Sequence, residues 1–114
     1  MSQSVLIMSN RFIINKLISA CTLGKPYYFL PYLFLNVIQT NMPNKIRFYY
    51  FFVDILRQAH KSKKSALKLV KEPIVYEGGN ETNYSFYDSF HRGPRISIII
   101  REEQNKIYLT TLPF

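Results

Sequence analysis

"RGPRISIIIREEQNKIYLTTLPF", residues 92–114, is the stretch that decides the fold. Its side chains follow a period of two, which is the spacing of one face of a β-strand. Two strands are predicted from this spacing. Ile96, Ile98 and Ile100 share one face of the first strand, and Ile107, Leu109 and Thr111 share one face of the second. The intervening Gln104–Asn105 pair favours a turn. The sequence therefore predicts a β-hairpin with strands over 95–101 and 106–112.

The same period continues upstream of this hairpin. Residues 74–77 form a predicted strand, Gly78-Gly79-Asn80 a turn, and residues 84–90 a second strand of alternating aromatic and polar side chains. Arg92-Gly93-Pro94 supplies the next turn. The sequence thus predicts a small antiparallel meander of about four strands.

Before the strands, "KIRFYYFFVDILRQAHKSKKSALKLVKEP" has the spacing of an amphipathic helix. Its predicted apolar face holds Phe52, Leu56, Ala59, Ala66 and Val70. A second face carries a row of cations, Arg57, Lys61, Lys64, Lys68 and Lys71. We expect one helix, or two helices broken near Ser62, that stop at Pro73. The cation row is either a solvated face or a stripe that contacts phosphates.

Residues 1–43 form a hydrophobic, acid-free segment that we expect to be helical. One helix is predicted between Ser9 as its cap and Gly24 at its end. A buried helix starting at Pro31 is predicted within the apolar segment 26–39. The first of these could be an ordinary amphipathic helix, a mitochondrial targeting peptide or a membrane-surface element. The segment 26–39 is too short to span a bilayer.

"TNMPN", residues 40–44, separates this segment from residues 44–114, the basic helix and meander. At 114 residues the two parts make one domain overall. Helices followed by an antiparallel meander place the chain in the α+β class.

The charge is strongly positive, with a net value of +8 and no Asp or Glu before Asp54. Such a chain favours polyanionic partners, RNA first and an anionic membrane surface second. Cys21 is the sole cysteine, which excludes an intramolecular disulfide and a CxxC metal site. We expect no metal and no cofactor, because the glycine-rich nucleotide loops, a GxSxG elbow and metal-ligand spacings are all missing. Without a convincing secretory signal, a cytoplasmic location is favoured, with a mitochondrial or membrane-associated one as the alternative.

A basic surface with two histidines and strand-end hydroxyls is enough for metal-free RNA cleavage. A base takes the 2′-hydroxyl proton, an acid protonates the leaving oxygen, and cations stabilise the phosphate. The candidate catalytic residues are His60, His91, Arg95, Thr110 and Thr111, with Tyr84 beside them. The candidate RNA contacts are Arg57, Lys61, Lys64, Lys68, Lys71 and Arg92. Each has a plain alternative as an exposed helix residue, a turn residue, a sheet-edge charge or an ordinary strand residue.

The second half, residues 51–114, resembles the small metal-independent RNases of the barnase–EndoU–colicin–RelE-like group, toxin and phage-associated members above all. The resemblance lies in "HKSKKSALKLVKEPIVY", a helix with His or Lys before a strand near Pro, in the aliphatic strand "ISIIIREE", and in "KIYLTTLPF", which ends in Thr near Pro. It implies an endoribonuclease whose cleft on the sheet gathers His60 or Lys64, Arg95, and Thr110 or Thr111. A protein inhibitor is then a candidate partner.

Three functions therefore follow from the sequence. The first is a metal-independent ribonuclease of toxin type, and the second is a non-enzymatic RNA- or ribosome-binding protein. The third is a small membrane-associated protein anchored by residues 1–39. The sequence leaves the oligomeric state open.

Overall fold

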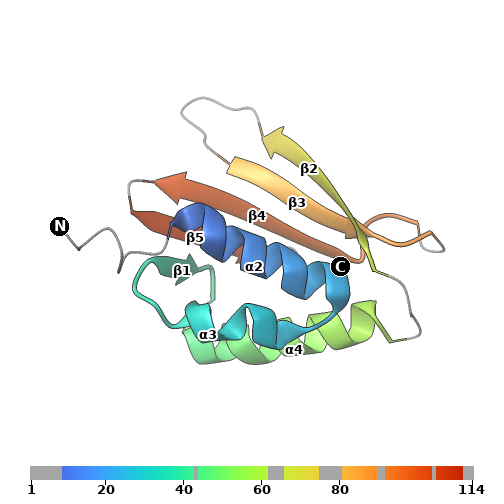
Figure 1. The fold of residues 1–114 in the computed structure, drawn as a ribbon, viewed down its shortest axis with the longest axis horizontal. Coiled ribbons are helices and arrows are strands. Elements are labelled where there is room, and N and C mark those ends of the chain that lie inside the picture. Colours follow the sequence, from blue (N-terminus) through green and yellow to red (C-terminus); the bar gives the residue numbers. More distant parts are fainter. Residues whose placement is uncertain are drawn as a thin grey trace.

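The structure is a computed structural model, and it describes residues 9–42, 44–61, 66–74, 81–89, 92–103 and 105–111. The chain begins with the helix α2 (Asn10–Leu23), the 3-10 turn η1 (Pro26–Tyr28) and the short helix α3 (Leu30–Leu33). The first strand, β1 (Ile38–Thr40), comes next, and the helix α4 (Lys45–Ala59) follows it. Four strands follow: β2 (Lys68–Ile74), β3 (Glu81–Tyr87), β4 (Ile96–Glu103) and β5 (Lys106–Thr111). The fold is α+β, as the sequence predicts (Figure 1).

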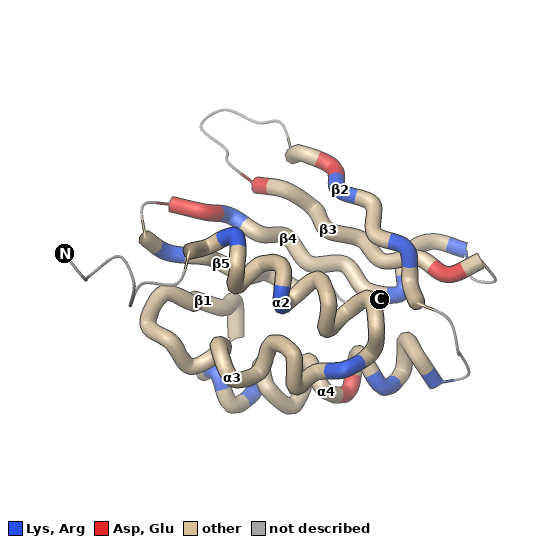
Figure 2. Tube along the Cα trace, in the orientation of Figure 1, with Lys and Arg blue, Asp and Glu red and all other residues tan. Residues whose placement is uncertain are grey.

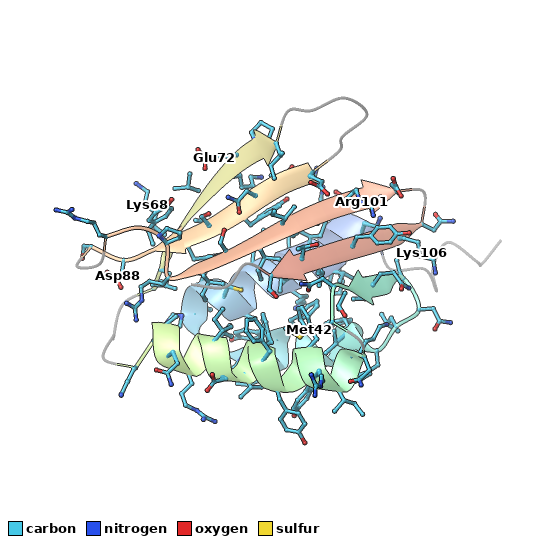
Figure 3. The ribbon with its side chains drawn as sticks, turned by 180° about the vertical axis from the view of Figure 1, so that it is seen from behind. Met42, Lys68, Glu72, Asp88, Arg101 and Lys106 are labelled. Atoms are coloured by element: carbon cyan, nitrogen blue, oxygen red, sulfur yellow. The ribbon has the colours of Figure 1, made fainter. Side chains whose placement is uncertain are left out.

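The five strands form one mixed sheet in the order β1-β5-β4-β3-β2. The strands β2 to β5 pair antiparallel in sequence, and β1 adds to β5 in parallel. The helix α2 lies across one face of the sheet, and α4 runs beside the β1–β5 end (Figure 1). From behind, the described elements leave the opposite face of the sheet uncovered (Figure 3).

The predicted first helix is confirmed at both ends. Ser9 caps α2, since its hydroxyl oxygen accepts a hydrogen bond from the Phe12 amide at 3.1 Å. Gly24 ends it in the left-handed conformation with φ of 71°, and its amide donates to the Ala20 carbonyl. Ile13, Leu17 and Cys21 on the inner face are buried.

The predicted buried helix starting at Pro31 is confirmed for a single turn only. The helix α3 ends at Leu33, and Ile38–Thr40 instead forms β1. The Ile107 amide donates to the Val37 carbonyl at 2.8 Å and the Asn41 amide to the Leu109 carbonyl at 3.1 Å. Residues 38–40 therefore pair in parallel with the edge of β5. A local apolar pattern cannot predict this pairing, because it depends on a strand far away in the sequence.

The prediction of helix up to Pro73 is wrong. The helix α4 starts at its cap Asn44 and ends at Ala59, and residues 68–74 form the edge strand β2. Pro73 is tolerated there because an edge strand has one unpaired side. Since side chains alternate across a strand, Lys68 and Lys71 point to opposite faces of the sheet. The single row of cations predicted for this stretch therefore does not form.

The predicted meander is present as β2–β5, with shifted ends. Its first strand lies at 68–74 and not 74–77, and its second at 81–87 and not 84–90. The predicted turn at 78–80 lies outside the described residues. The closing hairpin has the predicted faces, since Ile96, Ile98 and Ile100 are buried, and so are Ile107, Leu109 and Thr111.

One hydrophobic core joins both parts of the chain. Its largest fully buried side chains are aromatic: Phe29 from the N-terminal part, Phe48 and Phe52 from α4, and Phe86 from β3. The Phe29 and Phe52 rings meet edge to face at 5.5 Å, and Phe48 stacks on Phe52 at 5.9 Å. Each such ring contributes about 1.5–3 kcal/mol by its burial, so the helices and the sheet stabilise one another.

Candidate functional site

Charge is divided unevenly between the two layers. Residues 9–61 carry seven of the fifteen Lys and Arg residues and one acid, Asp54. The other six acids follow residue 71, and those in the described part lie on or beside the strands (Figure 2). The cationic surface of the described chain is therefore centred on the helices.

His60 holds two helix ends together. It is the residue that caps α4, and its Nε2 atom lies 2.8 Å from the Cys21 carbonyl oxygen in the last turn of α2. In that geometry Nε2 donates the hydrogen bond to a carbonyl that α2 leaves unpaired. The ring also packs on Gly24, where a Cβ atom would lie 2.6 Å from the ring carbon Cγ. These contacts give His60 a structural role at this corner.

Arg95 lies at the same end of α4. One of its terminal nitrogens donates to the Gln58 carbonyl at 3.1 Å, and its Nε atom is 3.6 Å from the Asp88 carboxylate. Arg57 and Lys61 are exposed nearby on the chain, at the end of the same helix. Cations at a helix C-terminus are stabilised by the helix dipole. Four predicted site residues therefore lie at this end of α4: Arg57, His60, Lys61 and Arg95. The contacts of His60 and Arg95 connect α4 to its neighbours in the fold.

Thr110 lies on the other side of the sheet. It alternates with buried Leu109 and Thr111, so its side chain faces the uncovered surface, away from the helix layer that holds His60. Thr111 is 6% exposed, and its amide lies 3.4 Å from the side-chain oxygen of Asn41. His60 and Thr110 therefore do not share one groove.

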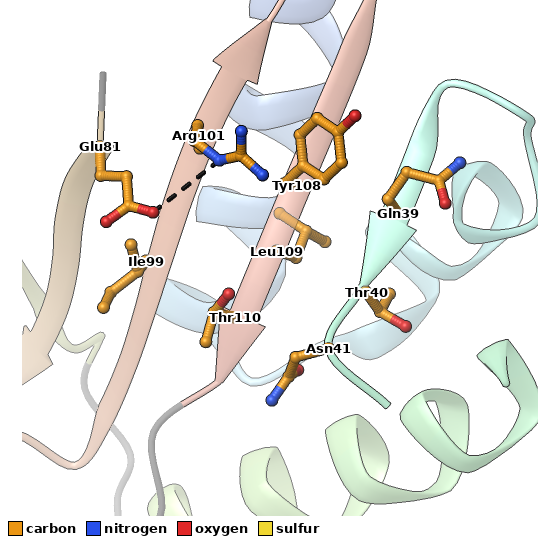
Figure 4. A pocket seen from close by; sticks show the side chains of 9 residues that line it. All are labelled: Gln39, Thr40, Asn41, Glu81, Ile99, Arg101, Tyr108, Leu109 and Thr110. Carbon is orange, nitrogen blue, oxygen red and sulfur yellow. Dashed lines mark ion pairs between the residues drawn. The ribbon is translucent and has the colours of Figure 1, made fainter. Parts of the chain in front are cut away.

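Thr110 does line a shallow pocket of about 220 Å³ on this face (Figure 4). A lateral row of paired residues crosses it: Gln39, Tyr108, Arg101 and Glu81. The Arg101 guanidinium lies 4.1 Å from the centre of the Tyr108 ring, and it forms ion pairs with Glu81 at 3.8 Å and Glu103 at 2.6 Å. Because two carboxylates already neutralise this cation, the pocket is a poor phosphate site.

A second cleft, of about 180 Å³, lies between α2 and the helix-facing side of the sheet. Arg11, Asn15 and Ile18 line it from one face of α2, at helical spacing. Lys71, Tyr84 and Glu102 line it from β2, β3 and β4. Lys71 and Tyr84 are direct cross-strand partners, and the Lys71 ammonium is 5.8 Å from the centre of the Tyr84 ring.

Two cations, a phenol and one carboxylate, Glu102, therefore line this cleft together. The pKa of Tyr84 is raised, first by partial burial and then by the negative charge of Glu102, while Arg11 opposes the rise. The phenol consequently keeps its proton at neutral pH and can donate a hydrogen bond. Arg11, Lys71, Tyr84 and the Asn15 amide form a donor set suited to a phosphate oxygen.

Sequence reasoning selected Lys71 and Tyr84 but missed Arg11 and Asn15. The two pairs are 56 to 73 residues apart in sequence, and they line one cleft only because α2 crosses the sheet. The one available signal was the Arg11–Asn15 spacing of four, which puts both on one helix face.

The remaining predicted residues are apart from this cleft or outside the described part. Arg92 is exposed in the turn before β4, and Lys68 is exposed on the uncovered side of β2. His91 and Lys64 lie outside the described residues. Within the described ranges no group of three or more His, Cys, Asp or Glu side chains could hold a metal ion. None of the described helices has the length and apolar character needed to cross a bilayer.

Comparison of the chain with protein-family models, with curated proteins and with solved structures finds no match.

Proposed function

We propose that this chain binds RNA without cleaving it, and that the cleft between α2 and the sheet holds a backbone phosphate. The proposal is based on the composition of the cleft: Arg11 lines it from α2 and Lys71 lines it from β2. The Tyr84 phenol lines the same cleft from β3, beside Lys71. Two cations and a neutral donor favour a phosphodiester, which offers one charge and several acceptor oxygens.

The surface around α2 favours an extended anion, rather than an isolated phosphate, as the ligand. Lys16 lies on a different side of α2 from Arg11, one turn after Phe12, and its ammonium lies 5.2 Å from the centre of the Phe12 ring. Phe12 is 42% exposed, so an aromatic face accompanies the cations. Basic side chains with exposed aromatics are what single-stranded nucleic acid requires, because phosphates pair with the cations and bases stack on the rings.

Binding is better supported than cleavage. The hypothesis of a ribonuclease site needs His60 or Lys64, Arg95, and Thr110 or Thr111 around one phosphate. His60 and Arg95 instead make structural hydrogen bonds, and Thr110 faces the other side of the sheet. The proposal accordingly assigns the RNA contacts to Arg11 and Lys71 and assigns no catalytic base.

The test is fluorescence anisotropy with a labelled single-stranded RNA, using the variants Arg11→Gln and Lys71→Gln. Each should weaken binding and lower the slope of log affinity against log salt by about 0.7, the value for one phosphate contact on a single strand. The matched control is Lys68→Gln, which removes an exposed lysine of the same strand on the opposite face and should leave the slope nearly unchanged.

Equal losses in Lys68→Gln and Lys71→Gln would show that net charge, and not the cleft, drives binding. The same RNA incubated with the protein in EDTA should stay intact. Degradation under those conditions would replace the proposal with the ribonuclease hypothesis.

A further inference from the structure

Apart from Lys45 and Arg47, the first half of α4 carries large apolar side chains on both its inner and its outer side. "RFYYFFV", residues 47–53, places Phe48 and Phe52 in the core, both fully buried. The opposite side of the same turns carries Ile46, Tyr49 and Tyr50, which are 59%, 37% and 68% exposed. A contiguous group of exposed apolar side chains marks an interaction surface, and nothing in the described chain covers the outer side of α4 at these residues.

A second apolar segment adjoins this side. Phe34 and Leu35, between α3 and β1, are 53% and 38% exposed. They lie next to the start of α4, because the Lys45 ammonium donates to the Leu35 carbonyl at 2.7 Å. We call these five side chains the α4 patch: Phe34, Leu35, Ile46, Tyr49 and Tyr50.

Most charges around the α4 patch are positive, and the exception is the exposed Asp54, one helical turn after Tyr50. Lys45 and Arg47 lie within it along the helix, and Lys106 reaches the Asn36 carbonyl at 3.1 Å beside Leu35. No Asp or Glu occurs in residues 1–53. Among the described residues, every exposed large hydrophobic side chain except Val70 also lies between residues 12 and 50. Exposed apolar surface and a local excess of positive charge therefore coincide.

We propose that the α4 patch docks the protein on an anionic lipid surface. Aliphatic and aromatic tips that project from a helix can enter the headgroup–acyl boundary, with tyrosines at the interface and Lys and Arg on lipid phosphates. The patch residues line neither of the two hollows described above. A second copy of this chain is disfavoured by like charge, since each copy carries +8.

This inference goes beyond RNA binding and uses a separate surface, because the α4 patch shares no residue with the Arg11–Lys71 cleft. The helix α4 runs along the bottom of the view in Figure 3, and the strands lie above it. Contact with a membrane through that side leaves the cleft between α2 and the strands open to RNA.

The experiment is flotation of the full chain with phosphatidylcholine vesicles, with and without phosphatidylglycerol. Binding should require the anionic lipid. The double variant Ile46→Ser/Tyr50→Ser should weaken it roughly tenfold or more, since two exposed apolar groups no longer enter the interface. Arg47→Gln should weaken it about fivefold, the effect of one cation near an anionic surface. The chosen residues are exposed, and circular dichroism should show an unchanged fold.

Two matched controls fix the assignment. Val70→Ser removes an exposed apolar side chain from β2, and Arg92→Gln removes an exposed cation from a distant turn. Both should bind vesicles like the unaltered protein. The proposal is overturned if Val70→Ser and Ile46→Ser/Tyr50→Ser behave alike, or if neutral vesicles bind equally well. A concentration-dependent dimer that Ile46→Ser/Tyr50→Ser abolishes would also overturn it, because a second copy would then cover the patch. Since RNA affinity is measured on the same variants, loss of the membrane inference leaves the RNA proposal standing.

Discussion

Replacing Gly24 by alanine tests the corner where α2 and α4 end. Gly24 has φ of 71°, and a Cβ atom there would lie 2.6–2.9 Å from three atoms of the His60 ring. The left-handed conformation alone costs an alanine about 1–2 kcal/mol. The ring must also move, which removes the bond from His60 to the Cys21 carbonyl, worth about 1 kcal/mol. We expect a total loss of roughly 2–3 kcal/mol in the free energy of unfolding.

Gly93 provides the matched control. Its φ is 75°, and a Cβ atom there would meet nothing within 4 Å. Gly93→Ala should therefore cost only the backbone part, about 1–2 kcal/mol. The difference between the two variants measures the contact with His60.

The assay is urea unfolding followed by far-ultraviolet circular dichroism, which suits a chain without tryptophan. The denaturant midpoint should fall further for Gly24→Ala than for Gly93→Ala, with the slope m unchanged. In the double variant Gly24→Ala/His60→Ala the clash disappears, so its cost should be smaller than the sum of the two single costs. Equal midpoints for the two glycine variants, or strict additivity in the double variant, would refute the reasoning.

Two further predictions concern titratable groups. Burial raises the pKa of the Cys21 thiol far above its usual range. The native protein should therefore resist a thiol reagent at neutral pH, and the unfolded protein in urea should react at the rate of a free cysteine. Fast labelling of the native protein would contradict the buried position. Burial raises the pKa of Tyr84 above its ordinary value near 10, so its contribution to stability should be complete below about pH 10 and lost as the pH rises through the folded pKa. The urea midpoint of the unaltered protein should then fall more steeply in alkali than that of Tyr84→Phe, and parallel curves would argue against the shift.

The closing hairpin and the first helix follow from sequence alone. The alternation in "RISIII" and "KIYLTT" places apolar side chains on one face of each strand, and this requires no distant partner. Likewise Ser9 and Gly24 act on backbone groups within a few residues. The concentration of positive charge on the helices was also visible, since residues 1–53 contain no acid.

Residues 68–73 show where local pattern fails. "KLVKEP" satisfies both a helical row of lysines and a strand, and pairing decides between them, because every residue of β2 has a partner in β3. The same holds for Ile38–Thr40, which becomes a strand because β5 offers an open edge. His60, a candidate base by residue type, is fixed as a structural donor by a carbonyl 39 residues away.

The sequence by itself therefore determined the α+β class, the helix caps, the apolar faces of the hairpin and the sign of the charge, which all depend on neighbours along the chain. Only the tertiary structure decided that Arg11 meets Lys71 and that Thr110 faces away from His60. The reason is physical: side chains far apart in sequence come together only when helices and strands pack, and that packing is set by burial of the whole core.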